Sequence, residues 1–303
     1  MEENKTLYVD DKDIKRSKSS FSTYSNEHIK YEGKYTKLDT NRLTLVLQTR
    51  NHIMDAVGYQ VLNAIYLLNY STSRQITEYL NVVKKLNISQ DKVSKKLRNF
   101  NNLSIATQQC FISDENIDGT NMKFYCLDKN GWVLLNGAGF TCNWKATDSL
   151  DNLHVKAYLV RNQYILKLYK ECTNIEKFKF KKLTSGIGAT YIVNDNSHII
   201  IPVRNTLNFE EEILNTISNL SRNSEIRSML NKKIIFLGED SKHIFNIFKL
   251  LSSNKLMESN MFFVTDLKLF DRNLNKIFVR FGVNKTEKGL NVIMKDEILT
   301  EFS

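Results

Sequence analysis

The chain has 303 residues, which is too many for one small hydrophobic core and enough for two domains. Its 43 lysine and arginine residues outnumber its 33 acidic residues, and the resulting charge of +10 suits a polyanionic partner. No apolar run is long enough to cross a bilayer, and the charged start does not resemble a signal peptide. We therefore expect a cytoplasmic protein without a membrane partner.

The cysteines lack the spacing of a metal site or a disulfide framework. Cys110, Cys126, Cys142 and Cys172 include no Cys-x-x-Cys pair, and the histidines are scattered. We expect free thiols in a reducing compartment, with a zinc site built from three cysteines as the less favoured alternative. The sequence therefore predicts neither a metal nor another cofactor.

Residues 1–40 are polar and have little apolar periodicity, which predicts a mostly disordered tail. The pattern changes at about residue 41, where 43–47 fits a short strand or the start of a helix. Residues 55–69 follow with an apolar stripe at helical spacing, formed by Val57, Val61, Leu62, Ile65 and Leu68. A folded domain is therefore expected to begin near residue 41.

Two short helices with a turn between them are predicted between residues 70 and 100. Ser71 or Thr72 can cap the first helix, and Asn87 or Ser89 can cap the second. The second helix has one apolar face, made by Val93, Leu97 and Phe100. A short basic helix with an apolar back is typical of the helix that enters the DNA major groove in helix-turn-helix proteins.

Polar residues of this second helix and of the turn before it are candidate DNA contacts. They are Lys84, Lys85, Ser89, Lys92, Ser94, Lys95, Lys96, Arg98 and Asn99. The lysines and Arg98 suit phosphates or guanine edges, whereas Ser94 and Asn99 suit base edges. The alternative is an ordinary surface helix of a protein-binding module, but the cations outnumber the one nearby acid, Asp91, and this favours DNA.

The next segment fits a strand pair joined by a loop. Residues 108–113 and 122–127 are β-prone, and the loop at 114–121 is rich in turn residues. A strand pair after three helices corresponds to the wing of a winged helix. Because the loop contains Asp114, Glu115 and Asp118, it is a poor probe of the minor groove. We therefore expect DNA binding to depend on the helix at 89–100.

The second half of the chain predicts a mixed α/β layer domain, at 146–303, after a winged-helix domain at 41–145. A helix at 150–170 opens this domain or joins the two. The further elements expected are strands at 176–183, 188–193 and 198–203, a helix at 208–220, a strand at 232–237, a helix at 243–251, and strands at 261–265, 276–281 and 290–294.

Two runs resemble the replication-relaxation family of plasmids and mobile elements from Gram-positive bacteria. They are YSTSRQITEYL at residues 70–80 and FYCLDKNGWVLL at residues 124–135. The residues that match the family's pattern are Arg74, Gln75, Ile76, Tyr125, Leu127 and Gly131, and Asp128 stands where the family often has threonine. The resemblance implies an N-terminal winged helix and a second half similar to the restriction-endonuclease fold.

Nucleases of that fold hold Mg²⁺ with an aspartate at the start of the second strand and a Glu-x-Lys pair on the third. In this chain the second strand opens at Gly188 and Ala189, and the third-strand pair falls on Pro202 and Arg204. None of these side chains can supply a carboxylate, so the resemblance implies an inactive, nuclease-like domain. Pro202 also lacks a backbone donor, which predicts an edge strand or a bulge there.

The sequence thus predicts an α+β protein, with an N-terminal winged helix-turn-helix followed by a mixed α/β restriction-endonuclease-like domain. We expect a non-enzymatic protein of a plasmid or mobile element that binds double-stranded DNA in replication, its control or DNA transfer. The alternatives are a scaffold that docks a replication or transfer protein, and a transcription regulator. A homodimer is compatible with each of these readings.

Overall fold

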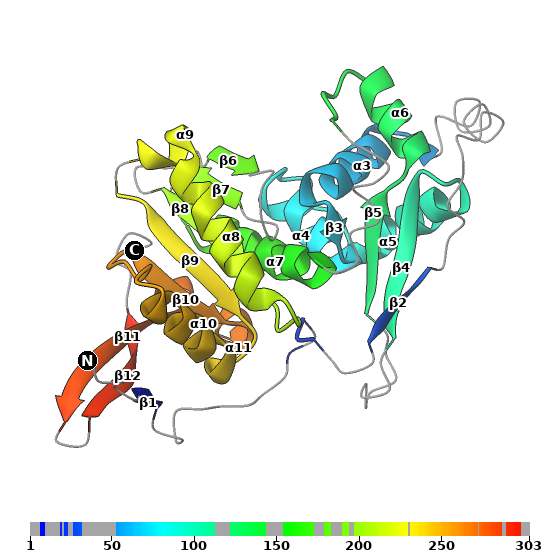
Figure 1. The fold of residues 1–303 in the computed structure, drawn as a ribbon. Coiled ribbons are helices and arrows are strands. Elements are labelled where there is room, and N and C mark those ends of the chain that lie inside the picture. The colour runs from blue at the N-terminus through cyan, green and yellow to red at the C-terminus, as the bar shows by residue number, and fades with distance from the viewer. Residues whose placement is uncertain are drawn as a thin grey trace. The chain divides into compact units, whose positions relative to one another are not determined.

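The computed structural model describes residues 7–9, 19, 21–23, 27–31, 53–112, 122–143, 154–172, 179–182, 190–193, 197–229, 231–271, 273–286 and 289–297. Helices and two β-sheets form a mixed α+β protein, as predicted (Figure 1). The chain divides into two compact units. Unit 1 comprises Met1–Ser22 and Lys167–Ser303, and unit 2 comprises Thr23–Leu166. Among the described residues, no helix is both long and apolar enough to cross a membrane.

Unit 2 combines helices with a small antiparallel sheet. Its elements in chain order are β2 (His28–Tyr31), α3 (Ala56–Leu68), β3 (Tyr70–Ser71), α4 (Ser73–Val82), α5 (Gln90–Asn102), β4 (Ala106–Ile112), β5 (Lys123–Leu127) and α6 (Lys129–Gly137). The four strands lie in the order β2-β4-β5-β3, and every neighbouring pair is antiparallel. The short strand β3 therefore ties the end of α3 to the far edge of the β4–β5 pair.

Side-chain caps begin the helices of unit 2. Asp55 accepts a hydrogen bond from the Gly58 amide ahead of α3, and Thr72 forms a reciprocal capping box with Gln75 ahead of α4. Ser89 caps α5 by accepting from the Lys92 amide. Of the alternatives that the sequence allowed, the structure selects Thr72 over Ser71 and Ser89 over Asn87.

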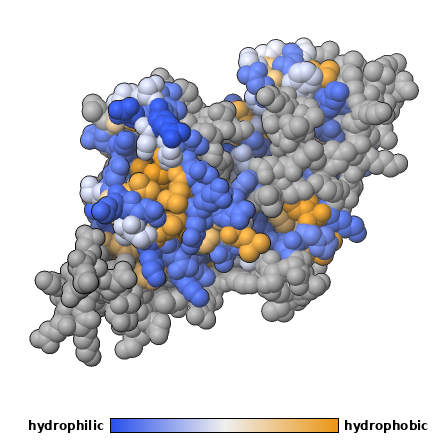
Figure 2. Space-filling model, in the orientation of Figure 1, coloured by the Kyte–Doolittle hydropathy of each residue, from blue (hydrophilic) through white to orange (hydrophobic). Residues whose placement is uncertain are grey.

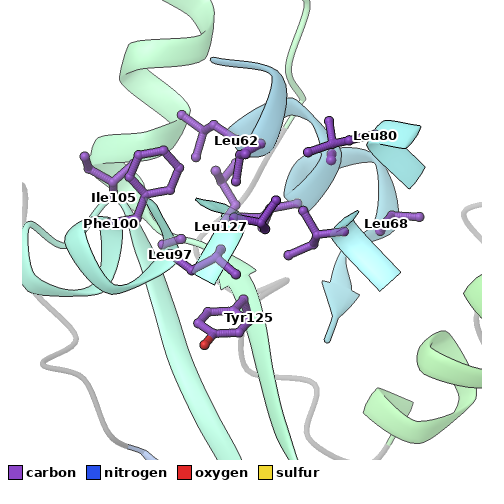
Figure 3. Close-up of a cluster of buried hydrophobic side chains, with 14 of the residues drawn as sticks. Leu62, Leu68, Leu80, Leu97, Phe100, Ile105, Tyr125 and Leu127 are labelled. Carbon is purple, nitrogen blue, oxygen red and sulfur yellow. The ribbon is translucent and has the colours of Figure 1, made fainter. Parts of the chain in front are cut away.

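One apolar core holds the helices and strands of unit 2 together. Figure 3 shows part of it, with Leu62, Leu68, Leu80, Leu97, Phe100, Ile105, Tyr125 and Leu127 labelled. Gly131 in α6 lies against this core, where an added Cβ would stand 2.2 Å from the carbonyl oxygen of Ile105. Only glycine permits so close an approach of helix to backbone.

Helix α7 (Val155–Glu171) begins in unit 2 and ends in unit 1, so it joins the two units. The boundary between the units falls within this helix, between Leu166 and Lys167, whereas the sequence predicted a domain boundary after residue 145. In its first half, Arg161 and Asn162 both donate to the carbonyl oxygen of Leu68, at the end of α3. Asn162 also donates to the carbonyl oxygen of Tyr70 at 2.7 Å. The bonds to Leu68 satisfy a buried backbone acceptor that the end of α3 leaves unpaired.

Unit 1 is built on an eight-stranded sheet in the order β1-β12-β11-β10-β9-β8-β7-β6. Its strands are β1 (Leu7–Val9), β6 (Lys179–Lys182), β7 (Thr190–Val193), β8 (His198–Pro202), β9 (Lys233–Gly238), β10 (Met261–Thr265), β11 (Phe278–Thr286) and β12 (Gly289–Glu297). The pairs β8–β9 and β9–β10 are parallel, whereas β6–β7 and β7–β8 are antiparallel. The carboxyl ends of β8, β9 and β10 therefore meet at one edge of the sheet.

Helices connect the parallel strands of unit 1. Helices α8 (Phe209–Arg222) and α9 (Ser224–Arg227) follow β8, and α10 (Ser241–Ser253) follows β9. Figure 1 shows α8 and α10 on the same face of the sheet. After β10 come α11 (Asp266–Asp271) and the 3₁₀ turn η5 (Leu274–Lys276). The order of elements confirms the mixed α/β layer that the apolar periods predicted.

Hydrophilic residues cover much of the described surface on the face drawn in Figure 2, with hydrophobic areas between them. Among the described residues, the large hydrophobic side chains that are exposed are Leu86, Leu207 and Phe270. The cysteines Cys110, Cys126, Cys142 and Cys172 are all buried free thiols, as expected. Burial and the charge of Asp128 raise the pKa of Cys126 to about 12, so this thiol stays protonated.

Parts of the predicted disordered tail are ordered, and for them the prediction is wrong. Residues Leu7–Val9 form β1, which pairs in parallel with β12, and His28–Tyr31 form β2. Ser19, Phe21 and Ser22 are buried. The prediction failed because these segments join sheets whose other strands lie far away in the sequence. The remaining residues of 1–40 lie outside the described part of the chain.

Strand β8 is an interior strand, so the prediction of an edge at Pro202 is also wrong. The ladder to β9 continues through Val203, whose amide donates to the carbonyl oxygen of Leu237 at 2.9 Å. Because successive amides alternate in direction, the donor missing at Pro202 points away from β9, at the last residue of β8 and two residues beyond Ile200, where the described β7–β8 pairing ends. The expected strand or helix at 43–47, the loop at 114–121, and Gly188 and Ala189 lie outside the described residues.

Candidate nucleic-acid interface

Helix α5 separates apolar and basic side chains onto opposite faces. Val93, Leu97 and Phe100 are completely buried in the core of unit 2. The exposed face contains Lys92, Lys95, Arg98 and Asn99. The apolar contacts hold the helix on the domain, while the cations and the amide face solvent. Such a helix can offer charge to phosphates and hydrogen bonds to base edges without giving up its own packing.

The turn before α5 adds two more exposed cations, Lys84 and Lys85. Lys85 and Asn87 adopt left-handed backbone conformations, with φ of 55° and 49°. The Asn81 side chain closes the turn, since its oxygen accepts from the Ile88 amide at 2.6 Å and its nitrogen donates to the Ile88 carbonyl at 2.9 Å. The turn is thereby held in one shape, with its lysines in solvent.

Ser89 stands at the exposed start of α5, where its hydroxyl oxygen accepts from the Lys92 amide at 3.3 Å. The first amides of a helix point along its axis and favour an anion at that end. Lys84 and Lys85 precede this end in the chain, and Lys92 follows in the first turn. Ser94 is partly buried, on the border between the exposed and buried faces. Apart from Ser94 and Lys96, the candidate DNA contacts are therefore exposed residues of α5 and of the turn before it.

Lys96 differs from the other candidates, because its side chain is buried. Its Nζ atom lies 2.8 Å from Asp55 Oδ1 and donates to the carbonyl oxygen of Ile53 at 3.1 Å. Burial alone would raise the pKa of Asp55, but the hydrogen bonds from Lys96 and Gly58 and the lysine charge outweigh it and lower this pKa. Lys96 is engaged inside unit 2, so we remove it from the DNA-contact set.

The helical spacing contained a signal for this burial. Lys96 lies three residues after Val93 and four before Phe100, which places it beside the apolar stripe of α5. The decisive partners, Ile53 and Asp55, lie in a distant part of the sequence, at the start of α3. A long cation can reach such a partner while its methylene groups cover apolar surface.

A second polar site, not found from the sequence, lies at the carboxyl ends of β8, β9 and β10 in unit 1. Arg204 forms a bidentate pair with Asp266, at 2.8 and 3.1 Å, and both side chains are buried. Arg204 also donates to the carbonyl oxygen of Leu237 at 2.9 Å. Glu239 is buried nearby in the fold and accepts from the Asn205 amide at 2.9 Å. The available signal was an acidic residue directly after each of two apolar strands.

His243 extends this polar cluster from α10. Its Nδ1 accepts from the Glu239 amide at 3.2 Å, and its Nε2 is buried without a hydrogen-bond partner. Burial, with a smaller contribution from the charge of Arg204, lowers the pKa of His243 to about 3. The imidazole is therefore neutral at physiological pH. Among the residues that the structure describes, no group of three or more histidine, cysteine, aspartate or glutamate side chains could hold a metal ion.

No protein-family model, curated protein or solved structure matches this chain. The resemblance to the replication-relaxation family therefore remains a hypothesis that depends on the two short runs in unit 2.

Proposed function

We propose that the protein binds double-stranded DNA through the exposed face of α5, with unit 2 acting as a winged helix. The observation that carries the proposal is the division of α5 into a buried apolar face and an exposed face with Lys92, Lys95 and Arg98. A helix of 13 residues held in this way can enter a major groove by its basic face.

The order of elements in unit 2 supports the winged-helix reading. A helix, a short strand and two further helices precede the β4–β5 pair, and β3 pairs with β5 rather than with β4. In a winged helix the third helix reads the groove and the strand pair forms the wing. The connection between β4 and β5 contains the three acids of residues 114–121. Because these acids would repel phosphates, we assign the DNA contacts to α5 and to the turn before it.

Unit 1, in this proposal, is a nuclease-like scaffold without cleavage activity. Its α7-β6-β7-β8-α8-α9-β9 order matches the helix, three strands, helix and strand expected of that fold. Arg204 occupies one of the positions where the nucleases use a metal-binding pair, and it is bonded to Asp266. The cellular role proposed is replication, its control or DNA transfer in a plasmid or mobile element, as the resemblance implies.

The DNA proposal is tested by fluorescence anisotropy with a duplex of about 30 base pairs from the protein's own genetic element and a scrambled duplex. We expect Lys95→Ala/Arg98→Ala to weaken binding about 10–100-fold, because two cations leave the centre of the exposed face. The matched control is Lys129→Ala, which removes an exposed lysine of unit 2 outside α5. Circular dichroism checks that each variant is folded.

The salt dependence gives an independent measure of phosphate contacts. Each lost contact should reduce the slope of log affinity against log salt by about 0.9. A double variant that binds both duplexes as tightly as wild type, with an unchanged salt slope, would contradict the proposal. The exposed face of α5 would then serve a protein partner, as in the scaffold alternative.

A further inference from the structure

Cationic side chains gather on one face of the sheet in unit 1. Arg280 in β11 and Lys295 in β12 are register partners, so their side chains lie on the same face. Phe263 pairs with Val279, which places Phe262 of β10 opposite Arg280. Lys295 is exposed and Arg280 is partly exposed. Phe262, Arg280 and Lys295 therefore follow one another across three neighbouring strands.

Lys233, at the start of β9, meets Arg280 over the Phe262 ring. The Lys233 Nζ atom lies 5.8 Å from the centroid of this ring, and the guanidinium carbon of Arg280 lies 4.4 Å from it. The ring itself is buried, which strengthens its attraction for both cations. Burial, and then the charge of Arg280, lower the pKa of Lys233. The two cations are therefore close enough to repel each other.

The positive charge on this face exceeds the negative charge. Among the side chains that the structure describes on this face of β9–β12, the acidic one is Glu297, whose Oε1 lies 3.7 Å from Arg280 Nη1. Both side chains are partly exposed, so solvent screens the pair. Like charges at facing positions of a sheet are unfavourable. An anion bound between the cations would offset this repulsion.

The opposite face of these strands packs against α10. Phe248 of α10 contacts Phe281 of β11 and Phe263 of β10, with ring centroids 4.6 and 6.4 Å apart. Figure 1 shows α10 lying along this side of the sheet. Because side chains alternate along a strand, Phe262 and Arg280 point to the other side. The cations therefore lie on the face that α10 does not cover.

An open pocket adjoins the cations at the amino ends of β9 and β10. Its volume is about 570 Å³, and its lining residues are Met229, Asn231, Lys232, Glu258, Ser259 and Asn260. Arg280 Nη2 donates to the carbonyl oxygen of Ser259 at 2.7 Å, which holds the guanidinium beside the pocket. The lining thus adds a lysine, two amides and a hydroxyl to the cations, together with the carboxylate of Glu258. Cations, amides and hydroxyls of this kind contact phosphates and sugars in protein–DNA complexes.

We propose that Lys233, Arg280 and Lys295, here called the basic row, bind the phosphate backbone of a nucleic acid. From β9 to β12 the row crosses three strand spacings, about 14 Å, which corresponds to about four phosphates of one DNA strand. A row of this length suits a chain of phosphates better than a single phosphate group. Phe262 and Phe278, the aromatic residues beside it, are buried and cannot insert into a lipid surface.

The choice of nucleic acid among polyanions rests on the function proposed above, to which the basic row adds a second contact surface. Lysine footprinting of the full chain with sulfosuccinimidyl acetate and mass spectrometry locates the contacts, with and without the same duplex. Acetylation of Lys295 should slow about threefold or more when the duplex is added, because a bound phosphate covers the amine. Acetylation of Lys249, an exposed lysine of α10, should not change.

Protection of Lys95 in the same sample reports the α5 contact, so the two proposals are scored separately. Protection of Lys95 without protection of Lys295 would overturn the basic row and leave the proposed function standing. Protection of Lys295 alone would support the basic row and contradict the assignment to α5. Protection of neither lysine would overturn both.

Variants with matched changes of charge give a second measurement. Arg280→Gln/Lys295→Gln removes two charges from the basic row, and Lys242→Gln/Lys249→Gln removes two from exposed positions of α10. The first variant should weaken duplex binding about 3–10-fold and lower the salt slope by about 1–2, since each phosphate contact contributes about 0.9. The α10 variant should change the affinity less than about twofold. Equal losses in the two variants would overturn the proposal.

Lys295→Gln alone keeps the test valid if the loss of the bond from Arg280 to Ser259 destabilises the sheet. It changes an exposed side chain and should lower the salt slope by about 0.9. Vesicles containing phosphatidylserine serve as the lipid arm. If Lys295→Gln lost binding to these vesicles and bound the duplex as wild type does, the basic row would be a membrane contact and the proposal would be overturned.

Discussion

Each unit buries one arginine completely or almost completely, but the two arginines have different partners. In unit 2, Arg161 is completely buried, and its hydrogen bonds run to Asn162 and to the carbonyl oxygen of Leu68. Burial lowers the pKa of Arg161 to about 10, which still leaves it charged at neutral pH. In unit 1, Arg204 is buried against a carboxylate, Asp266. Removing the charged partner of Arg204 should therefore cost unit 1 more stability than unit 2 would lose at Arg161, whose partners are uncharged.

The largest expected effect comes from removing the carboxylate of that pair. Asp266→Asn leaves Arg204 buried without a counter-charge, which should lower the free energy of unfolding of unit 1 by about 3–5 kcal/mol. Urea titrations followed by far-UV circular dichroism and hydrogen exchange measure the loss. Both tryptophans, Trp132 and Trp144, belong to unit 2, so tryptophan fluorescence reports the other unit separately.

A matched control for this variant is Asp296→Asn. Asp296 pairs with Lys268 in the same unit, but its side chain is 57% exposed. Solvent screens such a pair, so the expected loss is below about 1 kcal/mol. Similar losses in the two variants would show that burial does not distinguish these pairs.

Low pH should destabilise unit 1 more than unit 2, because unit 1 contains two buried histidines. Burial lowers the pKa of both His198 and His243 to about 3, with smaller contributions from Lys233 and Arg204. The unfolded chain takes up these protons near pH 6.5, whereas the folded chain does not. The stability is therefore complete above pH 6.5 and falls as the pH drops from 6.5 toward 3. Between pH 7 and 5, unit 1 should lose about 2 kcal/mol for each histidine.

The described residues of unit 2 include no buried histidine, since His28 is exposed and His154 is partly exposed. Hydrogen exchange at pH 7 and pH 5, corrected for its intrinsic pH dependence, should therefore show a larger loss of protection in unit 1. His243→Gln keeps an acceptor for the Glu239 amide and removes one titrating group, so it should halve the loss. Equal losses in wild type and His243→Gln would refute this assignment.

The smallest expected effect on stability comes from two neighbouring lysines of α5, one buried and one exposed. Lys96→Met removes the buried ammonium group that binds Ile53 and Asp55, and should destabilise unit 2 by about 1–2 kcal/mol. Lys95→Met, its exposed neighbour, should leave stability within about 0.5 kcal/mol. Tryptophan fluorescence during urea unfolding measures both changes.

DNA affinity should show the reverse order. Under conditions where both variants are folded, Lys95→Met should weaken binding and Lys96→Met should bind as wild type does. If Lys96→Met instead weakened binding as strongly without loss of stability, Lys96 would return to the contact set. The pair therefore tests whether burial separates structural from binding lysines on one helix.

Local sequence patterns predicted most of the helices and strands. The cap candidates Thr72 and Ser89, the apolar face of α5 and the single helices and strands of unit 1 are short-range features. Each depends on residues within a few positions of one another, and the structure confirms them. The errors fall at the N-terminus and at Pro202, where pairing with distant strands decides the outcome.

The residues of the candidate sites also fall into two groups, those that a local pattern predicts and those that distant contacts decide. The amphipathic period of α5 by itself determined which cations face solvent, apart from Lys96, because a helix repeats every 3.6 residues. Tertiary structure alone decided that Lys96 reaches Asp55, that Arg204 pairs with Asp266, and that Ser19 donates a hydrogen bond to Asp266. Those contacts join residues dozens to hundreds of positions apart, and their burial follows from packing, which no local pattern encodes.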